Sequence, residues 1–434
     1  MKLLTVDTID EARRKLLDCI TASREARREA RHELDSEEVE TGMALGRILA
    51  SDITAPEDLP NFRRSTVDGY AVFSADTVGA GESLPVLLRL AGAVEMGKPA
   101  GLSLARGQCA YVPTGGMIPD GADAMVMVEY TEALDGTGGR EIAVYESAAV
   151  GSHVARVGED IARGELLLRR GTSLRFREAG ALAAVGITRV PVYVPLRISI
   201  ISSGDELVRP PRGEPSGKPS PGEVRDVNTP ALEALAKESY YRVVGVRTVR
   251  DDEGELEAAV RDAMEKSDVV ALSGGSSQGT KDMTARVFSA LASPGVFTHG
   301  LAVKPGKPTV LGYDEKTGTV LAGLPGHPVS ALMVFRILFS WLTARLTGRG
   351  EPFPVPARIS CNLAGSPGRT GYQPVVLRPH DGGYLAEPVF GKAGMIATLT
   401  RSDGYIVIDL NREGLKKGEA VQVFPWAPGF PGCP

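Results

Sequence analysis

Residues 268–330 constrain the fold of this chain more than any other segment. They contain three apolar runs, and each run ends in a cluster of Gly, Pro, Ser or Lys: VVALSGGSSQGTKD, HGLAVKPGKP and VLAGLPGHPVS. Ligands bind at the carboxyl ends of strands in α/β sheets, so successive clusters of this kind predict one shared pocket. Gly-rich turns before helices offer N–H groups to an anion, and Lys304 and Lys307 add positive charge. The segment therefore predicts a phosphate or oxyanion site.

The region around this segment alternates between strand-like and helix-like patterns. Such alternation is typical of a parallel sheet with helices on both faces. We assign residues 177–348 to a doubly wound α/β domain. Its expected strands are 196–202, 243–249, 269–272, 299–303 and 319–323. Pro230 and Pro328 fit the first positions of helices.

The rest of the chain has a different texture. With 434 residues it exceeds the length that one hydrophobic core usually serves. Residues 51–149 alternate short β-like runs with Gly- and Pro-rich turns, which predicts an inserted, mainly β domain. The runs after Pro352 predict a C-terminal β barrel or sandwich over 349–434. Residues 1–50 and 150–176 fit neither pattern.

The expected strand ends also carry carboxylates. Glu206 follows the first strand, Asp251 the second and Asp282 the third. Carboxylates beside phosphate-binding turns normally hold a divalent hard cation, most often Mg²⁺. Simpler interpretations remain open for single pieces: Asp251-Asp252 is also a helix-cap pattern, KPGKP a surface turn, and His327 a neighbour of a helix N-terminus.

Two further segments are candidates for function. Asp68 lies in the turn of RSTVDGYAV, and Thr114 lies in VPTGGMIPDGADAMVMVE. Asp-Gly is also a favoured hairpin pair, so neither segment is diagnostic alone. The loop RPPRGEPSGKPSPGE (209–223) has low sequence complexity and is a candidate lid.

Charge and composition exclude several classes of protein. The net charge of −5 gives no global positive field for nucleic acid. The arginine-rich stretch within residues 8–34 fits a solvated helix face. Four dispersed cysteines favour reduced thiols in a cytoplasmic protein. The N-terminus lacks a secretory pattern, and the apolar helix 331–346, with two arginines, fits a buried core helix and not a membrane span.

Seven segments, in order, resemble the MoeA family of molybdopterin molybdenumtransferases, which includes the gephyrin E domain. They are RSTVDGYAV, VPTGGMIPDGADAMVMVE, ISSGDEL, DVNTPAL, LSGGSSQGTKD, KPGKPT and GLPGHPVSAL. The resemblance implies a multidomain α/β plus β protein. Its parts are an extended N-terminal domain (1–50 and 150–176), an inserted β domain (51–149), a molybdopterin-adenylyltransferase-like domain (177–348) and a C-terminal β barrel (349–434).

The resemblance also implies the reaction and its residues. Molybdate is inserted into adenylylated molybdopterin, AMP is released, and Mg²⁺ takes part. The implied catalytic residues are Asp68, Thr114, Asp251, Asp282, Lys304 and Lys307. The implied metal ligands are Glu206, Asp251 and Asp282. The implied substrate-binding residues are Ser273, Gly274, Gly275, Ser276, Ser277, Gly306, Pro325, Gly326, His327, Pro328 and Ser330.

The implied partners are a second copy of the chain, a molybdopterin adenylyltransferase and cofactor-accepting proteins, with neither nucleic acid nor membrane involved. In the implied homodimer, Asp68 and Thr114 reach a site of the other subunit. His327 stands where the family usually has Asn, and an imidazole can hydrogen-bond an oxyanion or titrate near neutral pH. A tungstate-selective enzyme and a non-catalytic cofactor carrier or scaffold therefore remain alternatives.

Overall fold

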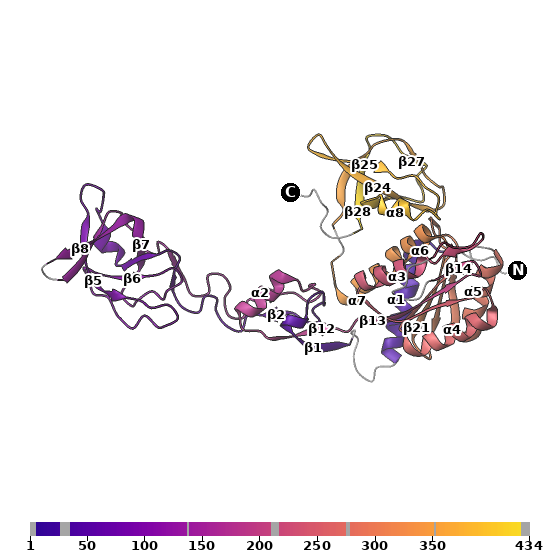
Figure 1. Ribbon diagram of the computed structural model, residues 1–434, viewed down its shortest axis with the longest axis horizontal. Coiled ribbons are helices and arrows are strands. Elements are labelled where there is room, and N and C mark those ends of the chain that lie inside the picture. The colour runs from indigo at the N-terminus through magenta and orange to yellow at the C-terminus, as the bar shows by residue number, and fades with distance from the viewer. Residues whose placement is uncertain are drawn as a thin grey trace. The chain divides into compact units, whose positions relative to one another are not determined.

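The computed structural model describes residues 6–26, 35–136, 139–209, 217–274, 278–350 and 353–426 (Figure 1). Contacts divide the chain into two units. One unit is Glu38–Val192, and the other joins Met1–Glu37 to Tyr193–Pro434. This division differs from the expected one at both borders, because the start of the chain groups with the α/β domain and residues 177–192 do not.

The unit Glu38–Val192 contains a six-stranded sheet in the order β7-β4-β6-β5-β9-β8. Its strands are β4 (Gly69–Val72), β5 (Val86–Ala93), β6 (Gln108–Val112), β7 (Ala124–Met127), β8 (Thr131–Gly136) and β9 (Gly139–Val144). Both faces are covered by apolar clusters, one around Met125 and one around Val126. These strands belong to the expected inserted β domain.

A smaller part of the same unit is built from short strand pairs and one helix. The elements are β1 (Ser36–Glu40) with β12 (Arg189–Tyr193), β2 (Ile53–Thr54) with β11 (Leu166–Leu168), β3 (Arg64–Ser65) with β10 (Val154–Ala155), and α2 (Phe176–Ala184). Leu182 of α2 packs with Leu49, Leu174 and Val190 in one buried cluster. This shared core explains why α2 and β12 group here and not with the α/β domain.

The second unit is organised on a six-stranded sheet in the order β16-β13-β17-β21-β20-β18. Its strands are β13 (Leu196–Ser203), β16 (Tyr241–Val249), β17 (Val269–Gly274), β18 (Pro294–His299), β20 (Val310–Asp314) and β21 (Thr319–Leu324). The first four in sheet order are parallel, whereas β20 is antiparallel to both of its neighbours. The expected strand at 299–303 is wrong, because β18 ends at His299. The strand β20 was not expected from the sequence.

Helices cover both faces of this sheet. They are α3 (Asn228–Glu238), α4 (Glu253–Lys266), α5 (Gln278–Leu291), α6 (Pro328–Phe335) and α7 (Trp341–Thr347), with a π turn, η4 (Arg336–Ser340), between the last two. The chain moves from β13 through α3 to β16 and then back through α4 to β17. Right-handed crossovers place α3 and α4 on opposite faces. The sheet order reverses between β13 and β17, which is where such folds bind ligands.

The combined helix α6–η4–α7 is the segment of the described chain that is long and apolar enough to cross a membrane. Its most apolar window is 67% buried inside the protein, and buried core helices commonly meet the same criterion. Pro328 stands at its first turn, as expected. Its packing against the sheet and against α3 fits the core helix that the sequence predicted.

The N-terminal helix α1 (Ile9–Ala26) packs on this unit through Ile9, Ala12, Leu16 and Ile20, which are all buried. Thr8 caps it, because Glu11 N donates to Thr8 Oγ1 at 3.3 Å and Thr8 N donates to a Glu11 carboxylate oxygen at 2.8 Å. The buried face of α1 and the hydrogen bond from Asp7 N to the Gly300 carbonyl oxygen, at 3.1 Å, tie the start of the chain to the α/β domain.

The C-terminal strands form a closed ring of pairings, β24-β25-β22-β28-β26 and back to β24, which confirms the expected barrel. The elements are β22 (Val355–Ile359), β24 (Thr370–His380), β25 (Gly383–Pro388), β26 (Gly404–Ile408) and β28 (Ala420–Pro425). A short pair, β23 (Leu363–Ala364) and β27 (Gly414–Leu415), and the helix α8 (Ala397–Thr400) complete it. Two further short strands, β14 (Leu207–Val208) and β15 (Val224–Arg225), pair beside the α/β sheet.

Candidate functional site

The centre of the candidate site is the switch point between β13 and β17. Ser203 at the end of β13 lies opposite Gly274 at the end of β17. A Cβ atom on Gly274 would stand 2.4 Å from the carbonyl oxygen of Ser203, so only glycine fits. Ser273 is buried beside it. The predicted Ser273 and Gly274 therefore lie at the sheet edge where a ligand would bind.

Asn228, the first residue of α3, connects this edge to the LPGHP turn. Its side-chain Nδ2 donates to Ser273 Oγ and to the carbonyl oxygen of Gly326, both at 2.7 Å. Because the Gly326 oxygen only accepts, it fixes which side of the amide carries the nitrogen. Asn228, which no motif singled out, thus brings together the two predicted residues Ser273 and Gly326.

The carboxylates gather at the neighbouring strand ends. Ser203 Oγ donates to Asp251 Oδ1, and Asp251 N donates to Asp205 Oδ1 at 3.2 Å. The Glu206 side chain folds back on its own turn, where a carboxylate oxygen lies 2.7 Å from the Cβ position of Gly204. Asp252 caps α4 by accepting from Glu255 N at 2.8 Å. Asp251 therefore faces the site edge, whereas Asp252 serves the helix.

The LPGHP turn leads directly into α6. Pro325 is buried and Gly326 is half-buried, whereas His327 is exposed at the N-cap position. His327 Cδ2 lies 3.4 Å from the Cβ position of Gly394, and Val329 N donates to the Ala393 carbonyl oxygen at 3.0 Å. The turn therefore contacts residues 393–394 of the C-terminal barrel domain.

The KPGKP segment is held by the barrel and not by a strand of the α/β sheet. Its first residue belongs to β19 (Val303–Lys304), which pairs with β24. Gly306 has φ +116°, and a Cβ there would stand 2.4 Å from a methyl group of Val334 in α6. Thr309 Oγ1 donates to the Gly306 carbonyl oxygen at 2.7 Å. The segment therefore does not follow a strand of the α/β sheet, as was expected, but these contacts hold it in one conformation.

A pocket of about 380 Å³, which we call the oxyanion pocket, lies between this segment, the start of α6 and the barrel. Lys304, Lys307 and Arg369 line it, together with the buried hydroxyl of Ser330. Among the described residues that line it, none is acidic. Three cations without a balancing carboxylate favour an anionic ligand, and guanidinium and ammonium groups hydrogen-bond oxyanions well.

Asp68 and Thr114 lie together in the other unit. Thr114 N donates to Asp68 Oδ1 at 2.8 Å, and both residues are exposed. Gly69, which follows Asp68, packs so closely that a Cβ there would stand 2.0 Å from the Val126 carbonyl oxygen. The two predicted residues therefore form one local polar turn.

Several predicted residues lie outside the part of the chain that the structure describes. Gly275, Ser276 and Ser277 lie outside the described residues, as do the side chain of Asp282 and residues 210–216 of the candidate lid. Within the described part of the chain, no group of three His, Cys, Asp or Glu residues is placed to hold a metal ion. The predicted set of Glu206, Asp251 and Asp282 is therefore not tested as a whole.

Two residues near the candidate site, Asn228 and Arg369, were not singled out from the sequence. Asn228 stood in the DVNTPAL segment, where an Asn at a helix start after a strand was an available signal. Arg369 lies in the barrel domain, and no local pattern marks it, because its role depends on the barrel meeting the KPGKP segment.

These features define a multidomain α/β protein with a ligand edge at its switch point and a cationic pocket beside it. Family models match in the same order along the chain. "MoeA N-terminal region (domain I and II)" matches residues 8–186, "Probable molybdopterin binding domain" matches 199–344, and "MoeA C-terminal region (domain IV)" matches 356–426. The chain belongs to the MoeA family, as its motifs indicated.

Individual relatives cover nearly the whole chain. The molybdopterin molybdenumtransferase of Haemophilus influenzae is 30% identical over 96% of this chain and 98% of its own length. Molybdopterin molybdenumtransferase 1 of Mycobacterium tuberculosis is 30% identical over 88% of this chain and 92% of its own. A solved structure of a molybdopterin biosynthesis MoeA protein from Pyrococcus horikoshii OT3 covers 97% of this chain and 100% of its own, with 29% identity and a TM-score of 0.74.

Proposed function

We propose that this protein is a molybdopterin molybdenumtransferase of molybdenum cofactor biosynthesis. Its substrates are adenylylated molybdopterin and molybdate. Water attacks the phosphoanhydride, AMP leaves, and the two dithiolene sulfurs replace oxygen ligands of molybdate, which leave as water. The observation that carries this proposal is the oxyanion pocket, because Lys304, Lys307 and Arg369 line it without an acidic partner among the described lining residues. Membership of the MoeA family and the similarity to the molybdopterin molybdenumtransferase of Haemophilus influenzae support the same activity.

The substrates divide between the two parts of the site. Molybdate binds at Lys304, Lys307 and Arg369, with Ser330 as a neutral donor. The phosphate of the pterin binds at the β17 end, where Ser273 and Gly274 lead into Gly275–Ser277. The turn Pro325–Pro328 lies between the two parts, since Gly326 is tied to Asn228 on one side and α6 begins on the other. This turn therefore connects the proposed phosphate site with the proposed molybdate site.

Mg²⁺ fits the donors at the adjacent strand ends. Asp205 and Asp251 are exposed, and the backbone N of Asp251 donates to Asp205 Oδ1, which keeps the two residues close together. Carboxylate oxygens are the ligands that Mg²⁺ prefers. In enzymes of this kind, Mg²⁺ usually takes one or two carboxylates and completes its shell with substrate phosphates and water. We assign Asp205 and Asp251 as its ligands, with Glu206 and Asp282 from the family pattern. When bound, the ion neutralises charge on the phosphoanhydride.

The direct test uses purified protein with adenylylated molybdopterin, molybdate and Mg²⁺. AMP release together with formation of active cofactor is expected. Absence of both, with a correctly folded protein, would overturn the assignment. A parallel series with tungstate separates a molybdate enzyme from a tungstate-selective one.

We also propose a homodimer in which Asp68 and Thr114 complete the site of the other subunit. Their exposed polar turn supports this, because it presents a carboxylate and a hydroxyl at the surface. Mixing Asp68→Ala with Lys307→Ala subunits should restore part of the activity that each variant lacks. No restoration in a mixed dimer would count against a shared site.

The same proposal places the protein in the cytoplasm. A molybdopterin adenylyltransferase supplies its substrate, and cofactor-accepting proteins remove its product. Neither nucleic acid nor a membrane takes part. Fractionation of cells that express a tagged chain, followed by identification of co-purified proteins, tests these assignments.

A further inference from the structure

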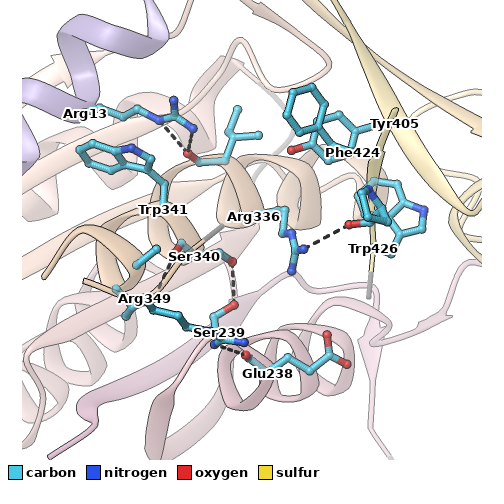
Figure 2. Close-up of a pocket in the computed structure, with 15 residues that line it drawn as sticks. Arg13, Glu238, Ser239, Arg336, Ser340, Trp341, Arg349, Tyr405, Phe424 and Trp426 are labelled. Carbon is cyan, nitrogen blue, oxygen red and sulfur yellow. Dashed lines mark hydrogen bonds between the residues drawn. The ribbon is translucent and has the colours of Figure 1, made fainter. Parts of the chain in front are cut away.

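A second cavity, of about 390 Å³, lies where α1, the end of α3 and the α6–η4–α7 helix meet barrel strands β26 and β28 (Figure 2). We call it the arginine–aromatic cavity. Its volume lies within the range of small-molecule sites. None of its described lining residues also lines the oxyanion pocket, so the proposed reaction leaves it unexplained.

Arg336 has more hydrogen-bond donors than the cavity satisfies. The side chain is half-buried and extends toward β28, where Nη2 donates to the Pro425 carbonyl oxygen at 3.3 Å (Figure 2). A guanidinium carries five N–H donors. Within the described residues, the Arg336 side chain makes this one hydrogen bond and no ion pair. The remaining donors are available to a ligand in the cavity.

The charge of the cavity wall also favours an anion. Arg13, Arg336 and Arg349 line it, and Glu238 is the one acidic residue among the described lining residues. The Glu238 side chain is exposed, and its contact with Arg349 is through the backbone oxygen, at 3.5 Å. Arg13 has Asp10 at 4.0 Å, the limit of an ion pair. Arg336 is therefore the guanidinium of this wall whose charge is open to an anion, since within the described residues its side chain hydrogen-bonds only to the Pro425 carbonyl oxygen.

Aromatic rings supply the rest of the wall. Tyr405 stacks on Phe424 with ring centroids 5.5 Å apart and lies 5.1 Å from the ring of Trp426. Across the cavity, the Arg13 guanidinium lies 5.1 Å from the centre of the Trp341 ring. Flat apolar walls favour a ligand with a flat apolar group, since aromatic pairs add to the gain from burial.

The helix that carries Arg336 is irregular at this point. The π turn Arg336–Ser340 interrupts it, and the Ile337 carbonyl oxygen accepts hydrogen bonds from Arg13 Nε and Nη2 at 3.0 and 2.7 Å. Single π turns within helices occur frequently at functional sites. The irregular turn is therefore an observation, independent of charge, that points to the same cavity.

We propose that the arginine–aromatic cavity binds a carboxylate carried on an aromatic group. Arg336 pairs with the carboxylate through its planar fork, which matches carboxylate geometry. The aromatic group lies between Trp341 and the Tyr405–Phe424–Trp426 rings. A singly charged carboxylate suits a cavity with such apolar walls better than a doubly charged phosphate, because burial of each charge costs free energy.

The test uses the full chain and its own fluorescence. The sequence has two tryptophans, Trp341 and Trp426, and both line the cavity. N-acetylphenylalanine is titrated as the carboxylate probe, and N-acetylphenylalaninamide is the matched neutral probe. We expect a saturable change in tryptophan fluorescence with affinity for the acid about tenfold or more above that for the amide. Equal affinities, or no response to either probe, would overturn the proposal.

Variants locate the charge without relying on one fold-sensitive change. Arg336→Gln should remove the preference for the acid, whereas Arg261→Gln, on the exposed surface of α4, should keep it. If Arg336→Gln does not fold, the acid–amide comparison on the unaltered protein still decides. A blocked peptide with Asp next to Phe separates the two sources of this chemistry. Binding of the peptide indicates a protein partner, and binding of the free acid alone indicates a small molecule.

Discussion

Asn228 donates a hydrogen bond from Nδ2 to Ser273 Oγ at 2.7 Å, which ties the start of α3 to the carboxyl end of β17. The two residues are 45 positions apart in the chain. The same nitrogen reaches Gly326, so one amide holds both the predicted phosphate turn and the turn before α6.

Asn228→Asp keeps the size of this side chain but removes its donors. An aspartate at this position accepts only, so it opposes the carbonyl oxygen of Gly326 and keeps a hydrogen bond with Ser273 only if the serine hydroxyl turns to donate. We expect a loss of about 1–3 kcal/mol in the free energy of unfolding, together with weaker substrate binding. Denaturant unfolding and AMP release measure the two effects. Asn411→Asp, at an exposed barrel turn, is the control, and an equal effect at both positions would contradict the assignment.

Arg369→Gln tests the contribution of the barrel to the oxyanion pocket. Removal of one of the cations should weaken molybdate binding about tenfold, since charge-assisted hydrogen bonds to oxyanions are strong. Titration calorimetry with molybdate measures it. Arg378→Gln, on β24 but paired with Glu387 outside the pocket, should leave the affinity unchanged. Unchanged affinity in Arg369→Gln would remove this residue from the site.

Gly306→Ala tests the shape of the KPGKP segment. The alanine would need a positive φ and would place its Cβ 2.4 Å from a Val334 methyl group. We expect a destabilisation of about 1–3 kcal/mol, because the strained backbone and the clash both oppose the native segment. Thermal unfolding and molybdate affinity are the measurements. Gly217→Ala, which has open space around its Cβ position, should have little effect.

Lys15→Met tests the attachment of α1. Asp7 is buried, and Lys15 Nζ contacts its two carboxylate oxygens at 2.8 and 2.7 Å while Thr298 Oγ1 donates at 2.6 Å. Loss of the ammonium leaves a buried charge unpaired and should cost about 3 kcal/mol. Lys266→Met breaks an exposed pair with Asp262 and should cost under about 1 kcal/mol. Similar losses in the two variants would argue against a buried pair.

Asp314 predicts a pH dependence of stability. Burial raises the pKa of this carboxyl, but the hydrogen bonds from Thr317 and Ser293 together lower it by more than burial raises it. The net pKa of Asp314 therefore lies below its ordinary value of 3.8. A lowered folded-state pKa contributes stability above the unfolded-state value, and that contribution is lost as the pH falls through the folded-state pKa. Asp314→Asn should therefore be less stable than the parent at neutral pH, and the difference should shrink below about pH 3.8.

Unfolding curves at neutral and acid pH check this expectation. The exposed Glu265→Gln is the matched control and should show no such convergence. A difference between Asp314→Asn and the parent that stays constant with pH would rule out Asp314 as the source.

Local patterns predicted much of the architecture. The buried runs of β13, β17 and β21, the cap at Asp252 and Pro328 at the start of α6 were all readable, because each depends on residues close in sequence. The strand β20 was missed, and KPGKP was attached to the wrong strand. Their pairing partners are set by sheet order and by the barrel, which no local period encodes.

The sequence by itself determined the α/β pattern, the family and the turns that carry Ser273, Lys304 and Gly326. Only the tertiary structure decided that Asn228 joins the turns of Ser273 and Gly326, the second of which is 98 residues away from it in the chain. It also decided that Arg369 of the barrel completes the oxyanion pocket. It also placed α1 on the α/β domain and built a cavity around Arg336. The physical reason is the range of the interactions. Caps, turns and apolar periods act over a few residues, whereas hydrogen bonds and pocket walls depend on which distant segments the folded core brings together.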